Sequence, residues 1–416
     1  QPAIWEVKYA YQYVRFQKTP DGYQITNFHD FIDLSRYAID WTVTGNGEKL
    51  FTGTIGSLNL PPRTSKEIPD PVPDFKPETG VEYFIDFSVK NKEDLPFRPA
   101  GFEVAHDQFK LDAYIPLANN QAVKGSLEFL EDQEEITVTG ENFLVCFDKK
   151  SGLLSSYEIN GLELLQKGPQ INFWRPPNDN DKGNGMINRL GIWRSVTNNA
   201  TPREVRVKQP QIGMVRVTAI FGLEEVNGIN QVDYTIKADG KVTLASSLNL
   251  KGDEELPNLP RYGLRWELPV HFDNLEYFGR GPHENYIDRN RSAFVGLYSG
   301  KVADQYFNYV RPQENGYKTD TRWFELRNQN GVGIRVTGDP LIGFSALHNP
   351  IEDFDMKDMN DYRHTNDIQK KDGVFICCDL KMMGLAGDNS WGARPYPEYS
   401  VPAQDYQFSF TLEPVF

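Results

Sequence analysis

The sequence predicts an all-β protein, and three features of its 416 residues lead to that prediction. Short runs of alternating apolar and polar residues recur along the chain, as expected of strands with one buried face. Turn-forming residues are frequent, with 34 Gly, 27 Pro and six Asn residues that directly precede a Gly. Almost no segment keeps a helical period over three turns, so we expect one short helix, within residues 351–371.

The first block, residues 1–118, is predicted to be an immunoglobulin-like β-sandwich. Seven or eight short strands fit between its turns, and its Pro-rich breaks, such as Pro61-Pro62, suit the length and turn density of that fold. An Asn46-Gly47 pair follows an alternating run that contains Trp41 and Val43, as in a hairpin. A polar linker is expected over residues 119–126.

The second block, residues 127–416, has too many predicted strands for one small sandwich. No signature recurs at a period of about 40–50 residues, so a propeller is not supported. A large sandwich of two sheets is the better expectation. Within it, residues 232–236 alternate, Asp239-Gly240 suggests a two-residue turn, and residues 242–244 begin the returning strand.

The charge of the chain argues against nucleic acid as a partner. Lys and Arg number 44 against 58 Asp and Glu, which gives a net charge of −14. An acidic chain with no basic face disfavours binding to a phosphate backbone but is compatible with a neutral ligand such as a sugar. No apolar run reaches 18 residues, so no membrane-spanning helix is expected.

Cysteine and histidine usage predicts neither a disulfide framework nor a zinc site. Cys377 and Cys378 are adjacent, so on a strand they face opposite sides, and Cys146 is far away in sequence. The six His show no zinc-ligand spacing, and no metal is expected. The first residues, from Gln1 to Trp5, already read as structured sequence, which suggests a piece of a longer protein and leaves the cellular compartment open.

Residues 173–183 form the first of four segments that stand out from the strand background. Two prolines stop the strand, and the following Asn/Asp run supplies capping groups. Within this run, Asn180 and Asp181 are also candidates for contact with the substrate. An EF-hand fails, because Lys182 and Arg189 would fall on positions that require oxygen ligands. Another kind of cation site stays open as an alternative to a polar loop bonded to itself, which we favour.

The second and third segments combine aromatic, imidazole, carboxylate and guanidinium groups. In residues 277–289, His283 and Glu284 are candidates for contact with sugar hydroxyls. An Arg–carboxylate network that braces a turn explains the same residues equally well. Residues 309–316 have similar chemistry, but there a hairpin turn is the stronger interpretation.

The fourth segment, residues 384–392, places Trp391 in a loop rich in Gly, Asp, Asn and Ser. A large ring is harder to bury in such a loop than in a strand. We therefore expect Trp391 to stack on the apolar face of a sugar while Asp388 and Asn389 bind its hydroxyls.

These four segments carry a family resemblance. The runs Arg-Pro-Pro-Asn-Asp-Asn-Asp-Lys-Gly, Gly-Arg-Gly-Pro-His-Glu-Asn-Tyr-Ile-Asp-Arg, Arg-Pro-Gln-Glu-Asn-Gly and Gly-Asp-Asn-Ser-Trp-Gly occur in that order. Together they resemble the C-terminal part of the large β-galactosidases of glycoside hydrolase family 2, over essentially the whole chain. The resemblance implies that the second block is a supersandwich similar to galactose mutarotase and that Trp391 is the family's substrate-contacting tryptophan.

The same resemblance implies which parts of the enzyme lie elsewhere. Retaining enzymes of this family use two Glu about 5 Å apart, both on a (β/α)₈ barrel that precedes the matching region. The Mg and Na ions typical of the family also belong to that preceding part, so no cofactor is expected in this chain. The implied partners are the barrel and N-terminal domains of the same parent chain, a terminal β-D-galactoside and, for the parent, further copies of itself.

Two other functions remain open at this stage. A stand-alone aldose epimerase would need a His/Glu acid–base pair, for which the candidates are His283, Glu284, Glu314, His348 and His364. A ligand-free structural β-sandwich module is the third possibility.

Overall fold

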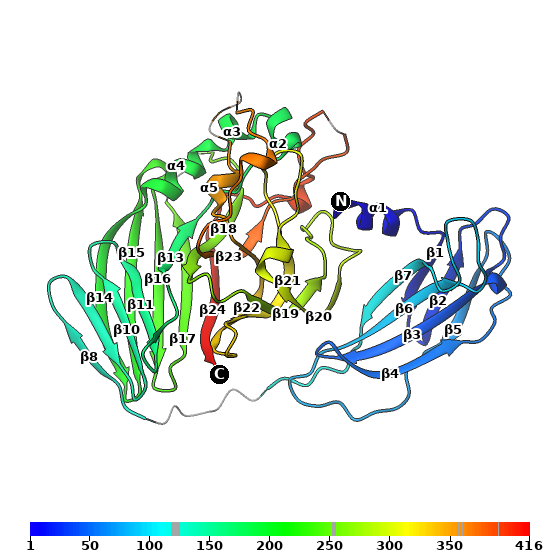
Figure 1. Ribbon diagram of the computed structural model, residues 1–416, viewed down its shortest axis with the longest axis horizontal. Helices are drawn as coiled ribbons and strands as arrows, with labels where there is room; N and C mark the ends of the chain where they lie inside the picture. The colour runs from blue at the N-terminus through cyan, green and yellow to red at the C-terminus, as the bar shows by residue number, and fades with distance from the viewer. Residues whose placement is uncertain (118–124, 252–254, 357, 359–360, 390) are drawn as a thin grey trace. The chain divides into compact units, whose positions relative to one another are not determined.

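The computed structural model describes residues 1–117, 125–251, 255–356, 358, 361–389 and 391–416. The chain divides into two compact units, Gln1–Asn120 with Arg291–Leu297, and Gln121–Asn290 with Tyr298–Phe416. Strands dominate both units, which confirms the all-β class (Figure 1). Residues 119–124 of the predicted linker lie outside the described residues.

The first unit is a sandwich of two antiparallel sheets. In its described residues the strand orders are β1-β2-β5 and β4-β3-β6-β7, an immunoglobulin-like arrangement. Both sheets contribute to one hydrophobic cluster, for example through Ile25 and Phe87, which are fully buried. The elements are α1 (Ala3–Ala10), β1 (Val14–Thr19), β2 (Gly22–Asn27), η1 (Leu34–Arg36), β3 (Tyr37–Gly45), β4 (Glu48–Ile55), β5 (Ser65–Pro69), β6 (Tyr83–Asn91) and β7 (Glu103–Lys110).

The described strands from residue 128 onward form two sheets, as predicted. Their bounds are β8 (Glu128–Glu131), β9 (Glu135–Thr139), β10 (Phe143–Asp148), β11 (Leu153–Ile159), β12 (Leu162–Glu163), β13 (Lys167–Asn172), β14 (Thr201–Gln211), β15 (Met214–Leu223), β16 (Gly228–Lys237), β17 (Val242–Leu250), β18 (Arg261–Leu268), β19 (Asn274–Gly281), β20 (Phe294–Lys301), β21 (Lys318–Arg327), β22 (Gly333–Leu347), β23 (Val374–Met382) and β24 (Tyr406–Val415).

The larger sheet has twelve strands in the described residues, most of them in the order β13-β18-β23-β22-β24-β17-β16-β15-β14. β21 pairs with β22 and β19, and β19 pairs with β20. The smaller sheet has the order β12-β11-β10-β9-β8. One hydrophobic cluster joins the two sheets, with fully buried members such as Phe147 and Tyr234, whose rings meet edge to face at 4.9 Å.

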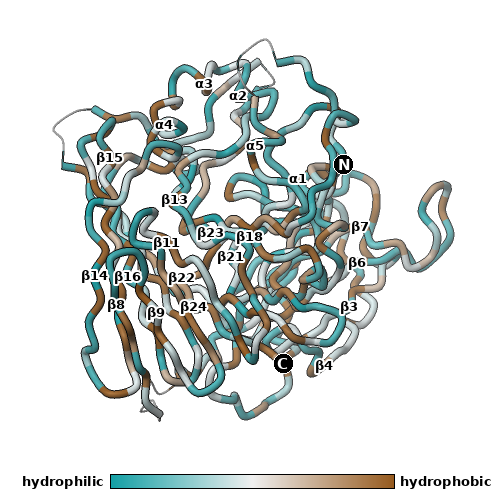
Figure 2. The backbone as a smooth tube through the Cα atoms, turned by 60° about the vertical axis from the view of Figure 1, so that its left-hand side comes forward, coloured by the Kyte–Doolittle hydropathy of each residue, from teal (hydrophilic) through white to brown (hydrophobic). Residues whose placement is uncertain are grey.

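Alternation along the strands explains how this core is built. Successive side chains of a strand point to opposite faces, and β16 is buried at every second residue from Gly228 to Ile236. Apolar and polar colours accordingly follow one another along the strands of the larger sheet (Figure 2). The alternation predicted for residues 232–236 is confirmed.

The predicted hairpins form, with one correction to a turn. Asn46 and Gly47 both have positive φ, 47° and 86°, and connect the paired residues Gly45 and Glu48 in a two-residue turn. The β16–β17 turn has three residues, 238–240, rather than two. The N–H of Lys237 donates to the carbonyl of residue 241, so these two residues are the last pair before the turn. Gly240, with φ 84°, takes the left-handed position that such a loop needs.

Helices are more numerous than predicted. The short helix expected in residues 351–371 is confirmed as α5 (Ile351–Phe354), although parts of that stretch lie outside the described residues. α1 and α4 (Gly191–Asn199) were not predicted because each spans only about two turns, too short for a helical period to stand out. The remaining helices are α2 (Asp179–Gly183), α3 (Met186–Arg189), η2 (Glu224–Val226), η3 (Val302–Gln305), η4 (Thr365–Asp367) and η5 (Pro397–Tyr399).

Cys377 and Cys378 lie on β23 and face opposite sides of the sheet, as predicted. Cys378 belongs to the hydrophobic cluster, whereas Cys377 lines a cavity on the other face. Both thiols, like that of Cys146, are free and buried. None of the described helices has the length and apolar character needed to cross a membrane.

Candidate functional site

The Asn/Asp run after β13 folds into a helix start that is bonded to itself. Asn178 caps α2, and its Oδ1 accepts the backbone N–H of Asp181 at 2.9 Å. The Asp181 carboxylate in turn accepts the N–H of Asn178 at 3.0 Å, which completes a reciprocal capping box. The self-bonded polar loop that we favoured from the sequence is therefore what the structure has.

Asp181 also forms a fully buried ion pair with Arg175. The guanidinium donates from Nη1 to Oδ2 at 2.5 Å and from Nη2 to Oδ1 at 3.1 Å, and both side chains are 0% exposed. Two parallel hydrogen bonds of this kind fix the relative orientation of the two side chains and also bring their opposite charges together. The oxygens of Asp181 are thus bonded by protein groups, and its contact with the substrate stays a prediction.

Three side chains from distant segments hold the backbone of residues 384–386. Arg175 and Asn178 donate to the carbonyls of the first two of these residues at 3.2 and 2.9 Å. The Asp288 carboxylate accepts the N–H groups of the second and third at 2.7 and 3.0 Å. Three of the four sequence segments thus converge on the base of the loop that carries Trp391.

The tip of that loop is fixed by a close backbone contact and an Asn side chain. Gly392 has φ 99°, and a Cβ placed there would lie 2.4 Å from the carbonyl carbon of Gly183, so the two loops touch where only Gly fits. The Oδ1 of Asn389 accepts the N–H groups of Trp391 and Ala393 at 2.9 and 3.2 Å. Residue 390 lies outside the described residues.

Trp391 is 86% exposed, while no other tryptophan of the chain exceeds half exposure. An exposed ring of this size on a fixed loop is unusual, since Trp is highly buried on average. Packing within the chain does not explain why a Trp stands at this position, whereas contact with a ligand or with a partner surface would explain it.

Two exposed tyrosines near this loop were missed in the sequence. Tyr396, half exposed, donates to the Asp388 carboxylate at 3.3 Å. Tyr362, 67% exposed, lies under the ammonium of Lys182, whose Nζ is 5.4 Å from the ring centroid. The signal for Tyr396 was its place between two prolines in the same loop, but Tyr362 approaches α2 only through the tertiary fold.

Glu284 has a bracing role instead of the predicted sugar contact. It is 6% exposed, and its carboxylate accepts the hydroxyl of Tyr309, an Nη2 hydrogen of Arg289 at 2.8 Å and the N–H of Gly316 at 2.8 Å. The Arg–carboxylate network that we weighed against a sugar surface is therefore present. It joins the second segment to the third.

The other predicted contacts stay accessible to different degrees. Asp388 and Asn389 are exposed, and Asn180 on α2 and His283 after β19 are half-buried. Nothing in their burial excludes a ligand contact.

A buried charge cluster lies beneath these loops. Arg261, 0% exposed, places Nη2 2.9 Å from an oxygen of Asp379 and Nη1 3.7 Å from an oxygen of Glu314. Two carboxylates thus share one guanidinium in a site without solvent. Burial raises the pKa of Asp379 to about 7 and also raises the pKa of Glu314, because the charged forms lose their hydration.

The proposed acid–base candidates for an epimerase are scattered. Of the five, Glu314 lines the cavity on the β18–β23 face. His348 is buried, with Nδ1 2.9 Å from the carbonyl of Gly373, and His364 is exposed. Among the described residues, no group of three or more His, Cys, Asp or Glu side chains is arranged to hold a metal ion.

Comparison with known protein families identifies the class of this chain. A model described as "Beta-galactosidase, domain 4" matches residues 23–112, and one described as "Beta galactosidase small chain" matches residues 139–412. The two sandwiches with their anchored loops are therefore a module of the glycosidase class. The chain belongs to the β-galactosidase small chain family.

Individual relatives agree with this assignment. A β-galactosidase of Priestia megaterium is 34% identical over all of this chain and 40% of its own length. Those of Streptococcus thermophilus and Halalkalibacterium halodurans are 28% and 30% identical over all of this chain and 39% and 40% of their lengths. The chain thus spans about 40% of the length of these relatives.

Among solved structures, the chain is similar to a putative aldose 1-epimerase of Escherichia coli K12, with a TM-score of 0.38 and 11% identity over 69% of this chain and 99% of that one. A galactose 1-epimerase of Lactobacillus acidophilus matches with a TM-score of 0.35 and 12% identity, over 70% of this chain and 99% of that one.

Proposed function

We propose that this chain is the non-catalytic C-terminal region of a retaining β-galactosidase that hydrolyses terminal β-D-galactosides. The family assignment and the share of about 40% in longer β-galactosidases support this proposal. Retaining hydrolysis needs two carboxylates about 5 Å apart on either side of the scissile bond. We assign both of them, and any Mg or Na ions, to a barrel that this chain does not contain.

One observation carries the more specific part of the proposal, namely the exposure of Trp391 on a loop that is fixed from both ends. Arg175, Asn178 and Asp288 hold the base of the loop, and Asn389 shapes its tip. A loop backbone held in place in this way loses little conformational entropy on binding. In our proposal the Trp391 ring stacks on the apolar face of the galactoside and completes a sugar site formed with the barrel.

The polar neighbours of the ring have separate roles in this proposal. Asp388, exposed and bonded to the Tyr396 hydroxyl, is placed to accept a hydrogen bond from a sugar hydroxyl. Asn389 uses its Oδ1 for the loop, which leaves its amide group for the ligand. Asn180 and His283 are secondary candidates at the edge of the same surface.

Kinetics of the full-length enzyme that contains this chain test the role of Trp391. Removal of a buried aromatic anchor from an interface typically costs about 2 kcal/mol or more, so Trp391→Ala should lower kcat/KM for a β-galactoside roughly 30-fold. Trp391→Phe should retain most of the activity, because a flat apolar ring remains.

The matched control is Ile212→Ala, another exposed apolar side chain (83% exposed), in the β14–β15 turn. This variant should leave kcat/KM unchanged. If Trp391→Ala is as active as this control, Trp391 does not contact the substrate. Incubation of the 416-residue chain alone with a β-galactoside should give no hydrolysis above buffer, and a measurable rate would overturn the non-catalytic assignment.

A further inference from the structure

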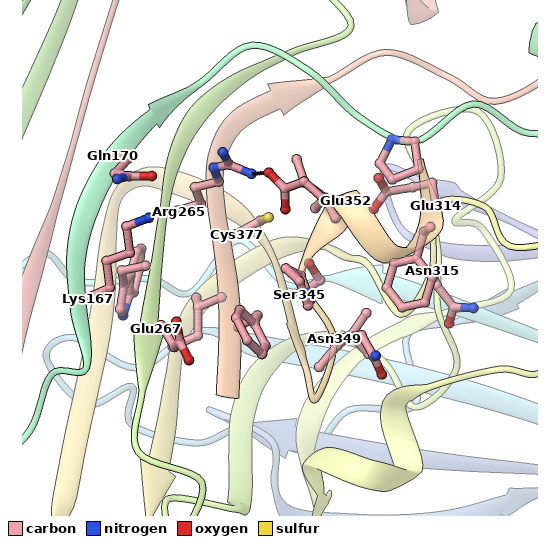
Figure 3. Close-up of a pocket in the computed structure, with 18 residues that line it drawn as sticks. Lys167, Gln170, Arg265, Glu267, Glu314, Asn315, Ser345, Asn349, Glu352 and Cys377 are labelled. Carbon is pink, nitrogen blue, oxygen red and sulfur yellow. Dashed lines mark hydrogen bonds and ion pairs between the residues drawn. The ribbon is translucent and has the colours of Figure 1, made fainter. Parts of the chain in front are cut away.

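A cavity of about 190 Å³ lies within the second unit, on the face of the larger sheet away from its core (Figure 3). Its floor is formed by β13, β18, β23 and β22, and its walls by the segment around Glu314 and by α5. It has no part in the role that we propose for Trp391.

Strand register explains why polar side chains gather on the floor. Gln170 pairs with Arg265, Arg265 with Cys377 and Cys377 with Ser345, so these four residues form one row across four adjacent strands. Cross-strand partners lie about 5 Å apart and share a face of the sheet. All four residues line the cavity.

A second row lies two residues further along β18, β23 and β22, and three residues along β13, where the register shifts. Lys167 pairs with Glu267, Glu267 with Phe375, and Phe375 with Leu347, and all four line the cavity. Residues two apart on a strand point the same way, so both rows face the same space. One end of the floor is therefore apolar, with an aromatic ring, and the remainder is polar.

The charged groups that line the cavity are more often acidic than basic. Arg265 forms an ion pair with Glu352 of α5, drawn as a dashed line in Figure 3. The three carboxylates of Glu267, Glu314 and Glu352 stand against the two cations Lys167 and Arg265. The lining therefore does not favour an anionic ligand such as phosphate.

Glu314 provides a polar group at the wall. It is 3% exposed, and Figure 3 shows its carboxylate directed toward the cavity. Its Oε2 is buried on the side of Arg261, with which it forms an ion pair at 3.7 Å. The residue as a whole lines the cavity and brings a carboxylate to its wall.

The size of the cavity limits what it can hold. At about 30 Å³ for each water, 190 Å³ corresponds to roughly six waters, which is small for a drug-sized ligand. A metal ion would need several converging oxygen, nitrogen or sulfur ligands, and no such group exists among the described residues.

We propose that this cavity binds one neutral, polyhydroxylated molecule of monosaccharide size. Glu314, Gln170 and Ser345 bond its hydroxyls, and Phe375 lies against its apolar C–H face. The site is separate from the loop of Trp391 and does not depend on the role proposed for that residue.

Calorimetric titration of the 416-residue chain with D-galactose, D-glucose, myo-inositol and inorganic phosphate tests the proposal. A ligand of this size in a preformed pocket should bind with a Kd on the order of millimolar. Saturable binding of at least one of the three polyols, without binding of phosphate, is the expected result. Binding of phosphate alone, or of none of the four, would overturn it.

Two variants locate the binding. Ser345→Leu fills the space above the polar row and should weaken binding at least about tenfold, whereas Ile212→Ala, in the exposed β14–β15 turn, should leave it unchanged. If Ser345→Leu does not fold, Gln170→Leu at the half-exposed edge of the same row replaces it. Binding that survives the cavity variant but is lost in Trp391→Ala belongs to the loop and refutes a site in this cavity.

Discussion

Replacement of Arg175 by Met tests the buried ion pair that fixes both loops. Met keeps an unbranched side chain, but it leaves the Asp181 carboxylate, 0% exposed, without a cation and the carbonyl of Gly384 without its donor. Loss of one partner from a buried ion pair costs about 3–5 kcal/mol, and the lost hydrogen bond adds about 1 kcal/mol. We expect the free energy of unfolding of the second unit to fall by at least about 4 kcal/mol.

Urea unfolding followed by tryptophan fluorescence measures this effect, since Trp174, Trp193 and Trp266 are all buried in the second unit. The matched control is Arg203→Met, because Arg203 pairs with Glu224 at the surface, where the two side chains are 48% and 70% exposed. An exposed pair contributes about 0–1 kcal/mol, so this control should unfold almost as the parent does.

The reasoning fails if Arg175→Met loses no more stability than the Arg203 control. Arg175→Lys gives a second readout, because it keeps the charge but loses the forked geometry, and should fall between the two. Chymotrypsin adds a local readout. Cleavage after the exposed Trp391 should be faster in Arg175→Met under native conditions, since the loop loses its anchor.

Two further predictions concern single backbone and charge positions. Gly392→Ala should destabilise the loop and speed chymotryptic cleavage after Trp391, because the new Cβ meets the Gly183 backbone at 2.4 Å. Gly331→Ala, at φ 83° with open space around it, should cost only about 1 kcal/mol. Asp86→Asn should stabilise the first unit, because burial raises the pKa of Asp86 to about 6, so that its ionisation opposes folding as the pH rises from 4 through 6. The gain should be at most about 3 kcal/mol at pH 8 and about half of that at pH 5, measured by hydrogen exchange of β6; an equal gain at both pH values would contradict the cause that we assign.

Local patterns explain most of what could be predicted about the fold. The period-2 alternation of β16 and the positive φ of Asn46 and Gly47 depend on neighbours within a few residues, so the sequence showed them directly. The two-turn helices α1 and α4 escaped prediction because eight or nine residues hold too few turns to reveal a period.

The site was predicted less evenly, for a different physical reason. Residue type indicates which chemistry a side chain offers but not which surroundings it meets. Asp181 and Glu284 have the groups of a sugar-binding site, yet both are buried and saturated by protein donors. Trp391, chosen because its loop offers little to bury a ring, is exposed.

By itself, the sequence determined the all-β class, the hairpins, the self-bonded polar loop after β13 and the family to which the chain is similar. Only the tertiary structure decided which distant segments meet. Arg175 bonds a carbonyl 209 residues away, and the row from Gln170 to Ser345 exists because β13, β18 and β23 are neighbours in the sheet but not in the chain. Such contacts depend on strand order and register, which local preferences acting over a few residues do not specify.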